Sequence, residues 1–66
     1  MKDFYIYTSD GKRFLIRGTS MQNILDQIGS AKMHNNGFIE ARIPITYKYV
    51  MIGISEITFI EEDDEI

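Results

Sequence analysis

Two pairs of tyrosines at alternate positions are the side chains of this 66-residue chain best suited to binding chemistry. Tyr5 and Tyr7 form the first pair, and Tyr47 and Tyr49 form the second. Residues two apart in a strand project from the same face, so each pair presents two phenol rings together. If the two strands lie side by side, the four rings form one continuous aromatic patch.

Basic residues accompany the tyrosines and leave two functions open. Tyrosine rings can stack on the bases of single-stranded nucleic acid while cations hold the phosphates. Alternatively, the tyrosines cover a sheet face or contact another protein chain, since tyrosine is favoured in both settings. We favour the protein contact, because the body of the chain has only a small positive charge. The candidate binding residues are Tyr5, Tyr7, Arg13, Arg17, Arg42, Tyr47, Lys48 and Tyr49.

Charge divides the chain into a body and an acidic end. Five consecutive acids, residues 61–65, follow the apolar residue Ile60, whereas all seven lysines and arginines lie upstream. We expect a single domain over residues 1–60 and a disordered acidic tail over residues 61–66. A charge run of this kind could also occupy a basic groove on a partner protein or compete for the cations of this chain.

Catalytic groups are sparse. The chain has no cysteine, and its one histidine, His34, lies in a polar segment with no acidic partner placed for it. Asp26 and Glu40 have no neighbour with which either would form a catalytic pair. We therefore expect no enzymatic activity, no metal site and no cofactor.

The small size of the chain favours self-association. A domain of this length buries a thin core, and disulfides, metals or oligomerisation usually reinforce such domains. Without cysteine, oligomerisation is the remaining device, so we expect a homo-oligomer. No apolar stretch of 18 residues and no signal-peptide pattern occurs, so we expect a cytoplasmic protein without a membrane anchor.

Alternating apolar residues predict the first two strands and a turn between them. Residues 3–8 and 13–18 alternate with period two, and Asp10-Gly11 between them is a strong hairpin signal. Thr19-x-x-Gln22 has capping-box spacing and predicts the start of a helix, with Gly29 as its C-cap. The apolar stripe of this helix must pack on the sheet. It consists of Met21, Ile24, Leu25 and Ile28.

The second half of the chain reads as three further strands. Asn35-Asn36-Gly37 predicts a turn, after which strands are expected over residues 38–43, 47–52 and 57–60. Pro44 cannot donate to a ladder and should end its strand or lie on an edge. The order β-β-α-β-β-β predicts an α+β fold, an antiparallel sheet with one helix on one face; a partly closed SH3-like barrel is the alternative.

The closing pattern carries a resemblance. Residues 52–62 read Ile-Gly-Ile-Ser-Glu-Ile-Thr-Phe-Ile-Glu-Glu, which is similar to the ends of small SH3-like or Sm-like barrels, where a short helical turn separates the final two strands. Together with the Asp-Gly hairpin and the single capped helix, it also resembles small β-rich proteins of phages and Gram-positive bacteria. The resemblance does not give a function, and the function class that we favour is a protein-binding accessory or inhibitor of phage or mobile-element origin.

We therefore expect a non-catalytic interaction module that self-associates and binds a protein partner. Nucleic-acid binding by the tyrosines together with Arg13, Arg17, Arg42 and Lys48 is the alternative function.

Overall fold

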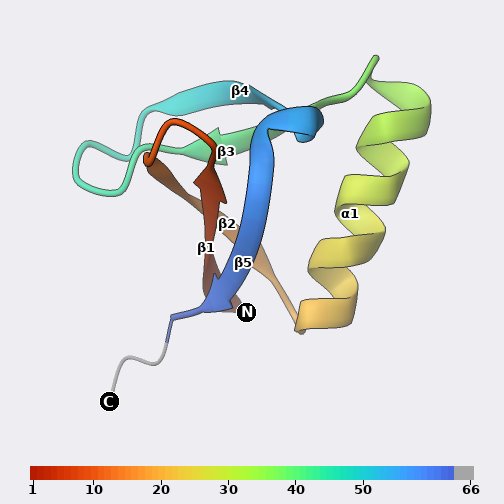
Figure 1. Ribbon diagram of the computed structural model, residues 1–66. Helices are drawn as coiled ribbons and strands as arrows, with labels where there is room; N and C mark the ends of the chain where they lie inside the picture. The colour runs from red at the N-terminus through yellow and green to blue at the C-terminus, as the bar shows by residue number, and fades with distance from the viewer. Residues whose placement is uncertain (64–66) are drawn as a thin grey trace.

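The computed structural model describes residues 1–63 and has the predicted order of elements (Figure 1). The elements are β1 (Lys2–Thr8), β2 (Arg13–Gly18), α1 (Met21–His34), β3 (Phe38–Arg42), β4 (Tyr49–Gly53), the 3₁₀ turn η1 (Ile54–Glu56) and β5 (Ile57–Glu62). The predicted β-β-α-β-β-β order is therefore confirmed, and η1 separates the last two strands. No helix within residues 1–63 has the length and apolar character needed to cross a membrane.

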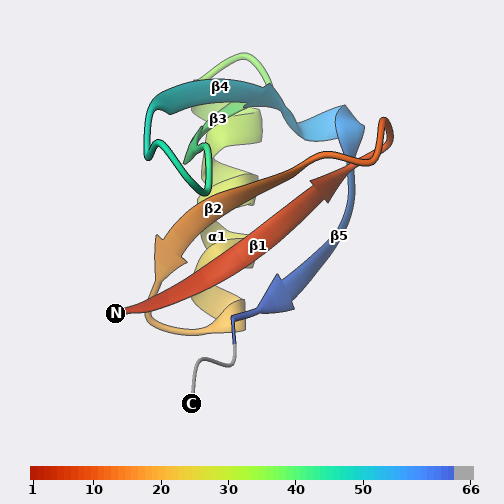
Figure 2. The ribbon, with the colours of Figure 1, turned by 90° about the vertical axis from the view of Figure 1, so that its left-hand side faces the viewer.

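The strands form one antiparallel sheet in the order β4-β3-β2-β1-β5. This arrangement confirms the α+β class. β4 and β5 are the two edges, so the sheet is not closed into a barrel. The sheet also twists strongly, and β3 and β4 cross β1 and β2 at a steep angle (Figure 2). The change of strand direction occurs between β2 and β3, because these two strands share the single register pair Leu15 and Arg42.

The first hairpin forms as predicted. Gly11 has a φ of 85°, a conformation open to glycine without a Cβ penalty, and its N–H donates to the carbonyl of Thr8 at 3.0 Å. Asp10 supports the same turn, because its carboxylate accepts hydrogen bonds from the Thr8 hydroxyl and from the Lys12 N–H. The turn therefore fixes the register of β1 against β2.

Alternate residues of the strands build the core on the sheet face that packs on α1. Phe4 and Ile6 of β1 are fully buried, as is Ile24 of α1. Ile39 and Ile52 pair directly across β3 and β4 and join the same cluster. The period-two alternation read from the sequence therefore corresponds to a buried inner face and an opposite, outer face.

The helix begins one residue later than predicted. Its N-cap is Ser20, whose hydroxyl accepts the N–H of Asn23 at 3.1 Å. The Asn23 side chain accepts in turn the N–H of Thr19 at 3.1 Å. The prediction of Thr19 and Gln22 as the capping box was wrong, because Ser20 is the cap and Asn23 is the side chain that reaches back, to the Thr19 N–H before the cap.

The helix also ends later than predicted. Gly29 lies inside α1, and the C-cap is Asn35, whose N–H donates to the carbonyl of Ala31 at 2.9 Å. The extra turn is held by Ala31, which is buried against the core. The predicted turn after the helix is confirmed, because Asn36 and Gly37 have φ angles of 55° and 81°.

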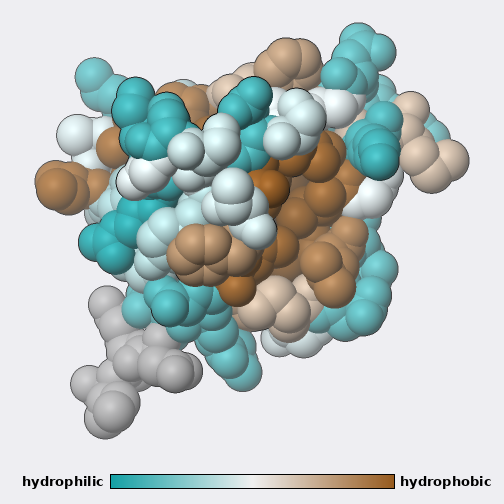
Figure 3. Space-filling view, viewed as in Figure 1, coloured by the Kyte–Doolittle hydropathy of each residue, from teal (hydrophilic) through white to brown (hydrophobic). Residues whose placement is uncertain are grey.

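Part of the apolar stripe of α1 remains uncovered. The helix contacts β2 and β3, and Ile24 lies in this contact. Leu25, one position on, is 49% exposed, so the expectation that the whole stripe packs on the sheet was wrong. Figure 3 shows a hydrophobic surface between α1 and β5.

The ends of the later strands differ from their predicted bounds. β3 ends at Arg42, before Pro44, and β4 starts only at Tyr49, because Tyr47 has a φ of 55° and belongs to the turn. β5 continues into the acidic run, where Glu61 and Glu62 are strand residues. The N–H of Asp63 donates to the carbonyl of Asp3 at 3.0 Å. Residues 64–66 of the expected tail lie outside the described residues.

Candidate functional site

A single row of side chains crosses all five strands of the sheet. Glu61 of β5 pairs with Tyr5 of β1, and Tyr5 pairs with Leu15 of β2. Leu15 pairs in turn with Arg42 of β3, which pairs with Tyr49 of β4. Directly opposed residues of neighbouring strands project on the same side of a sheet. The row therefore lies entirely on the face opposite α1.

This face, called the outer face below, brings together most of the predicted binding residues. In Figure 2 the helix lies behind β1 and β2, on the opposite side of the sheet. The register places six of the eight predicted residues on the outer face: Tyr5, Tyr7, Arg13, Arg17, Arg42 and Tyr49. Asp3, Leu15, Glu40, Met51, Phe59 and Glu61 share this face.

Aromatic contacts order the half of the outer face formed by β1, β2 and β5. The Arg13 guanidinium lies over the Tyr5 ring, 4.5 Å from its centroid. Tyr7 stacks on Phe59 with ring centroids 4.2 Å apart and planes at 10°. The Tyr7 hydroxyl donates to a Glu61 carboxylate oxygen at 3.0 Å. These contacts hold the rings in fixed positions on the surface.

A second pair orders the other half of the outer face. Arg42 Nη2 donates to the Tyr49 hydroxyl at 2.7 Å, and the Arg42 guanidinium carbon lies 4.8 Å from the centroid of the same ring. Both side chains project from neighbouring strands at opposed positions. Of the five guanidinium N–H donors of an arginine, this contact uses one, so Arg42 keeps donors for another group.

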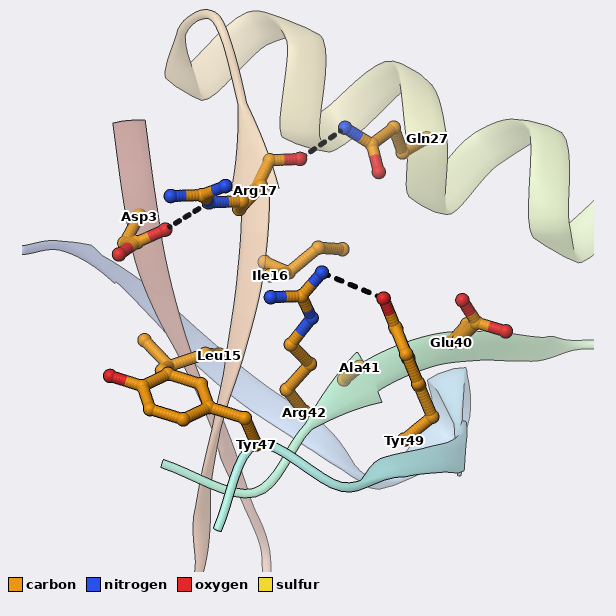
Figure 4. Close-up of a pocket in the computed structure, with 10 residues that line it drawn as sticks. All are labelled: Asp3, Leu15, Ile16, Arg17, Gln27, Glu40, Ala41, Arg42, Tyr47 and Tyr49. Atoms are coloured by element: carbon orange, nitrogen blue, oxygen red, sulfur yellow. Dashed lines mark hydrogen bonds and ion pairs between the residues drawn. The ribbon is translucent and has the colours of Figure 1, made fainter. Parts of the chain in front are cut away.

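Between the two halves the outer face is hollowed. Beyond the Leu15–Arg42 pair, β2 and β3 diverge and leave a depression of about 500 Å³ that Arg17, Arg42 and Tyr49 help to line (Figure 4). Gln27 of α1 spans the divergence, and its Nε2 donates to the Arg17 carbonyl at 2.8 Å. A side chain of α1 therefore forms a hydrogen bond to a carbonyl of β2 at a point where β2 no longer pairs with β3.

Two predicted residues, Tyr47 and Lys48, lie apart from the strands. Both are exposed in the β3–β4 turn, although Tyr47 also lines the depression. The two tyrosine pairs do not meet, because β2 and β3 separate β1 from β4. We expect a single patch of four rings only if the two strands lie side by side. They do not, and the patch is absent from the described structure.

The charges of the outer face cancel. Three arginines (Arg13, Arg17 and Arg42) share it with three acids (Asp3, Glu40 and Glu61). Arg17 forms an ion pair with Asp3 at 2.9 Å, through its Nε. The small positive charge inferred for the body of the chain is therefore not concentrated on this face.

Titratable groups do not converge on the outer face in a catalytic arrangement. Within residues 1–63 no three histidine or acidic side chains lie close enough to hold a metal ion. His34 is the exposed last residue of α1. The hydrogen bond from the Thr8 hydroxyl lowers the pKa of Asp10, with help from the Lys12 N–H and charge, but Asp10 lies in the β1–β2 turn.

Sequence reasoning missed several members of the face. Leu15 lies two residues from both Arg13 and Arg17, so the alternation of the strand is the signal for its place in the row. Phe59 and Glu61 gave no such signal, because their contacts with Tyr7 depend on β5 pairing with β1. That pairing joins the two ends of the chain.

Comparison with known proteins adds no relative. No protein-family model, no curated protein and no solved structure matches this chain.

Proposed function

We propose that the chain is a non-catalytic accessory or inhibitor protein that binds a protein partner through the outer face of its sheet. The observation that carries the proposal is the row from Glu61 through Leu15 to Tyr49, which spans the whole sheet and which no other element of residues 1–63 covers. A sheet face of this width offers a broad contact area to another protein.

The residue types of the outer face support a protein partner. Tyrosine and arginine are enriched in protein interfaces and among their energetically dominant positions. On this face both kinds are already held in place, as in the Arg13–Tyr5 and Arg42–Tyr49 pairs. Ordering these side chains before binding lowers the entropy lost when a partner docks.

The depression suggests how a partner is anchored. Arg42 has one N–H bonded to Tyr49, and its remaining N–H groups can donate to a carboxylate oxygen. Leu15 and Tyr47 add apolar lining beside it. Asp3 and Glu40 also line the depression, and Asp3 is paired with Arg17. We therefore expect a single aspartate or glutamate of the partner to bind at the donors of Arg42, flanked by an apolar side chain.

Charge argues against the alternative of nucleic-acid binding. A surface that binds a phosphate backbone needs an excess of cations, because phosphate neutralisation supplies most of the non-specific affinity. On the outer face three arginines are balanced in number by three acids, and Arg17 is paired directly with Asp3. Tyrosine stacking alone would then have to carry the binding.

Quantitative affinity capture from cells that express the chain tests the proposal. The baits are the full chain, two outer-face variants (Arg42→Ala and Phe59→Ala) and two matched controls on α1 (Lys32→Ala and Met33→Ala). Each control removes a cation or an exposed apolar side chain, as its counterpart does. Circular dichroism of all baits excludes unfolding as a cause of lost binding.

The expected result is a protein that the full chain and both controls retain and that both outer-face variants lose. Equal retention by all five baits would show that another surface binds. Fluorescence anisotropy with labelled single-stranded DNA and RNA separates the two functions. We expect no saturable binding at physiological salt, whereas affinity that falls with salt and with Arg42→Ala would favour nucleic acid.

A further inference from the structure

The free edge of β4 lacks the features that keep edge strands apart. Exposed edges usually carry charges, prolines or bulges that prevent pairing with another chain. β4 reads Tyr-Val-Met-Ile-Gly, with no charged residue and no proline, and its outward side faces away from every other element (Figure 1). We propose that a second copy of this chain pairs with it, β4 against β4, to form a continuous ten-stranded sheet.

The opposite edge of the sheet is protected. β5 ends with Glu61 and Glu62, and the next residue is Asp63. Its register against β1 shifts between Tyr7 and Thr8, which marks an irregularity of the bulge type. Negative charge and a bulge both oppose edge pairing. The sheet therefore has one edge that is protected against pairing, β5, and one open edge, β4.

The hydrogen bonds of the β3–β4 hairpin identify the backbone groups at the open edge. Ile43 N–H donates to the Lys48 carbonyl at 2.9 Å, and Ile54 N–H donates to the Gly37 carbonyl at 2.8 Å. Bonded positions alternate along an antiparallel strand, so the even-numbered residues of β4 face β3. The backbone groups of Tyr49 and Met51 and the N–H of Gly53 are therefore directed outward.

These outward groups are complementary to themselves around a two-fold axis. With Met51 opposite Met51 of the second copy, the two residues exchange backbone hydrogen bonds. The Gly53 N–H then faces the Tyr49 carbonyl of the other chain, on both sides of the axis.

The side chains fit the same register. The Tyr49 ring lies opposite the space left by Gly53, an arrangement that compensates for glycine in a strand. On the inner side, Val50 lies opposite Ile52, a β-branched pair of the kind that stabilises neighbouring strands. No like charges are brought together within the paired strands.

Exposed apolar side chains concentrate at this end of the molecule. Of the ten large exposed hydrophobic residues within residues 1–63, five lie between residues 38 and 51. Met51 itself is 56% exposed. An apolar groove of about 610 Å³ also lies beside β4, lined in part by Phe14, Val50 and Ile52. Pairing would cover the part of this surface that lies along β4 and reinforce a small core that has no disulfide.

Sedimentation equilibrium of the full chain tests the inference with matched methionine variants. Met51→Lys places two ammonium groups opposite each other at the axis, while Met33→Lys makes the same change at an exposed position of α1. We expect a dimer at high micromolar concentration whose dissociation constant rises about tenfold or more with Met51→Lys and is unchanged by Met33→Lys.

Mixing two variants tests the two-fold axis itself. Met51→Glu should weaken the dimer as Met51→Lys does, because like charges again face each other. An equimolar mixture of the two variants should associate, since a lysine then lies opposite a glutamate. Rescue in the mixture is the result that a general loss of stability cannot give.

Three outcomes would overturn the inference: a full chain that stays monomeric at high micromolar concentration, a dimer that resists Met51→Lys, and variants that fail to associate when mixed. None of them bears on partner binding by the outer face, which is tested through Arg42 and Phe59. An intact dimer together with equal capture of the partner by all five baits would conversely reject the proposed function alone.

Discussion

Leu15 and Arg42 form the single register pair that joins β2 to β3, and thereby join the two halves of the sheet. Leu15 is buried although it lies on the outer face, away from α1. Its neighbours in the row, Tyr5 and Arg42, flank it on the adjacent strands. The centre of the proposed binding face is therefore also a structural joint.

Leu15→Ala should destabilise the fold by about 2–5 kcal/mol, because it leaves a cavity at this joint. Leu25→Ala is the matched control, since Leu25 is half exposed on α1, and should cost less than about 1 kcal/mol. Urea unfolding followed by circular dichroism measures both. Equal losses would mean that Leu15 is not a core residue.

Gly18→Ala should lower the free energy of unfolding by about 1–3 kcal/mol through overpacking. A Cβ at Gly18 would lie 2.6 Å from Ile24 Cδ1 and 2.6 Å from Asn23 Oδ1, where β2 approaches α1. Gly29→Ala meets no atom within 4 Å and should raise the free energy of unfolding by about 0.5–1 kcal/mol through helix propensity. A neutral Gly18→Ala in thermal unfolding would contradict this packing.

Ser20→Ala should cost about 1 kcal/mol, because it removes the hydroxyl that accepts the Asn23 N–H. Thr19→Ala keeps the backbone N–H that Thr19 contributes to Asn23 and should change stability by less than about 0.5 kcal/mol. Chemical denaturation ranks the two variants. The reverse ranking would restore Thr19 as the cap.

Acid should weaken the first hairpin through Asp10. The Thr8 hydroxyl and the Lys12 N–H lower the pKa of Asp10 below its ordinary value of 3.8. The charged form of Asp10 is thus favoured in the folded state. Its contribution to stability is fully present above pH 3.8 and is lost as pH falls through the lowered pKa. Asp10→Asn should abolish this part of the acid dependence. The difference in urea midpoint between the two proteins, measured as a function of pH, should shrink in acid; a constant difference would refute the assignment.

Local patterns predicted most of the fold because local chemistry decides it. Alternation gave the strands, and Asn36-Gly37 gave a turn that needs positive φ. The helix end was predicted wrongly because Gly29 resembles a C-cap, while the burial of Ala31 by the sheet extends the helix past it. Tertiary packing here overrides a local stop signal.

The candidate site shows the same division. Alternation placed Tyr5 with Tyr7 on one face, and the structure agrees. It could not reveal that two strands separate this pair from Tyr49, nor that Phe59 stacks on Tyr7, because strand order is a long-range property. Tyr47 lies outside the strand predicted for it, because the turn after Pro44 extends further than alternation suggested.

Photo-crosslinking in cells that express the chain tests the central claim, binding of a protein by the outer face, most directly. Benzoylphenylalanine replaces exposed residues on the outer face, Arg13 and Glu40, and exposed control residues on α1, Lys32 and Met33. The account predicts that both outer-face positions cross-link the same protein and that neither control does. Cross-links to that protein from α1 alone, or to nucleic acid from the outer face, would contradict it.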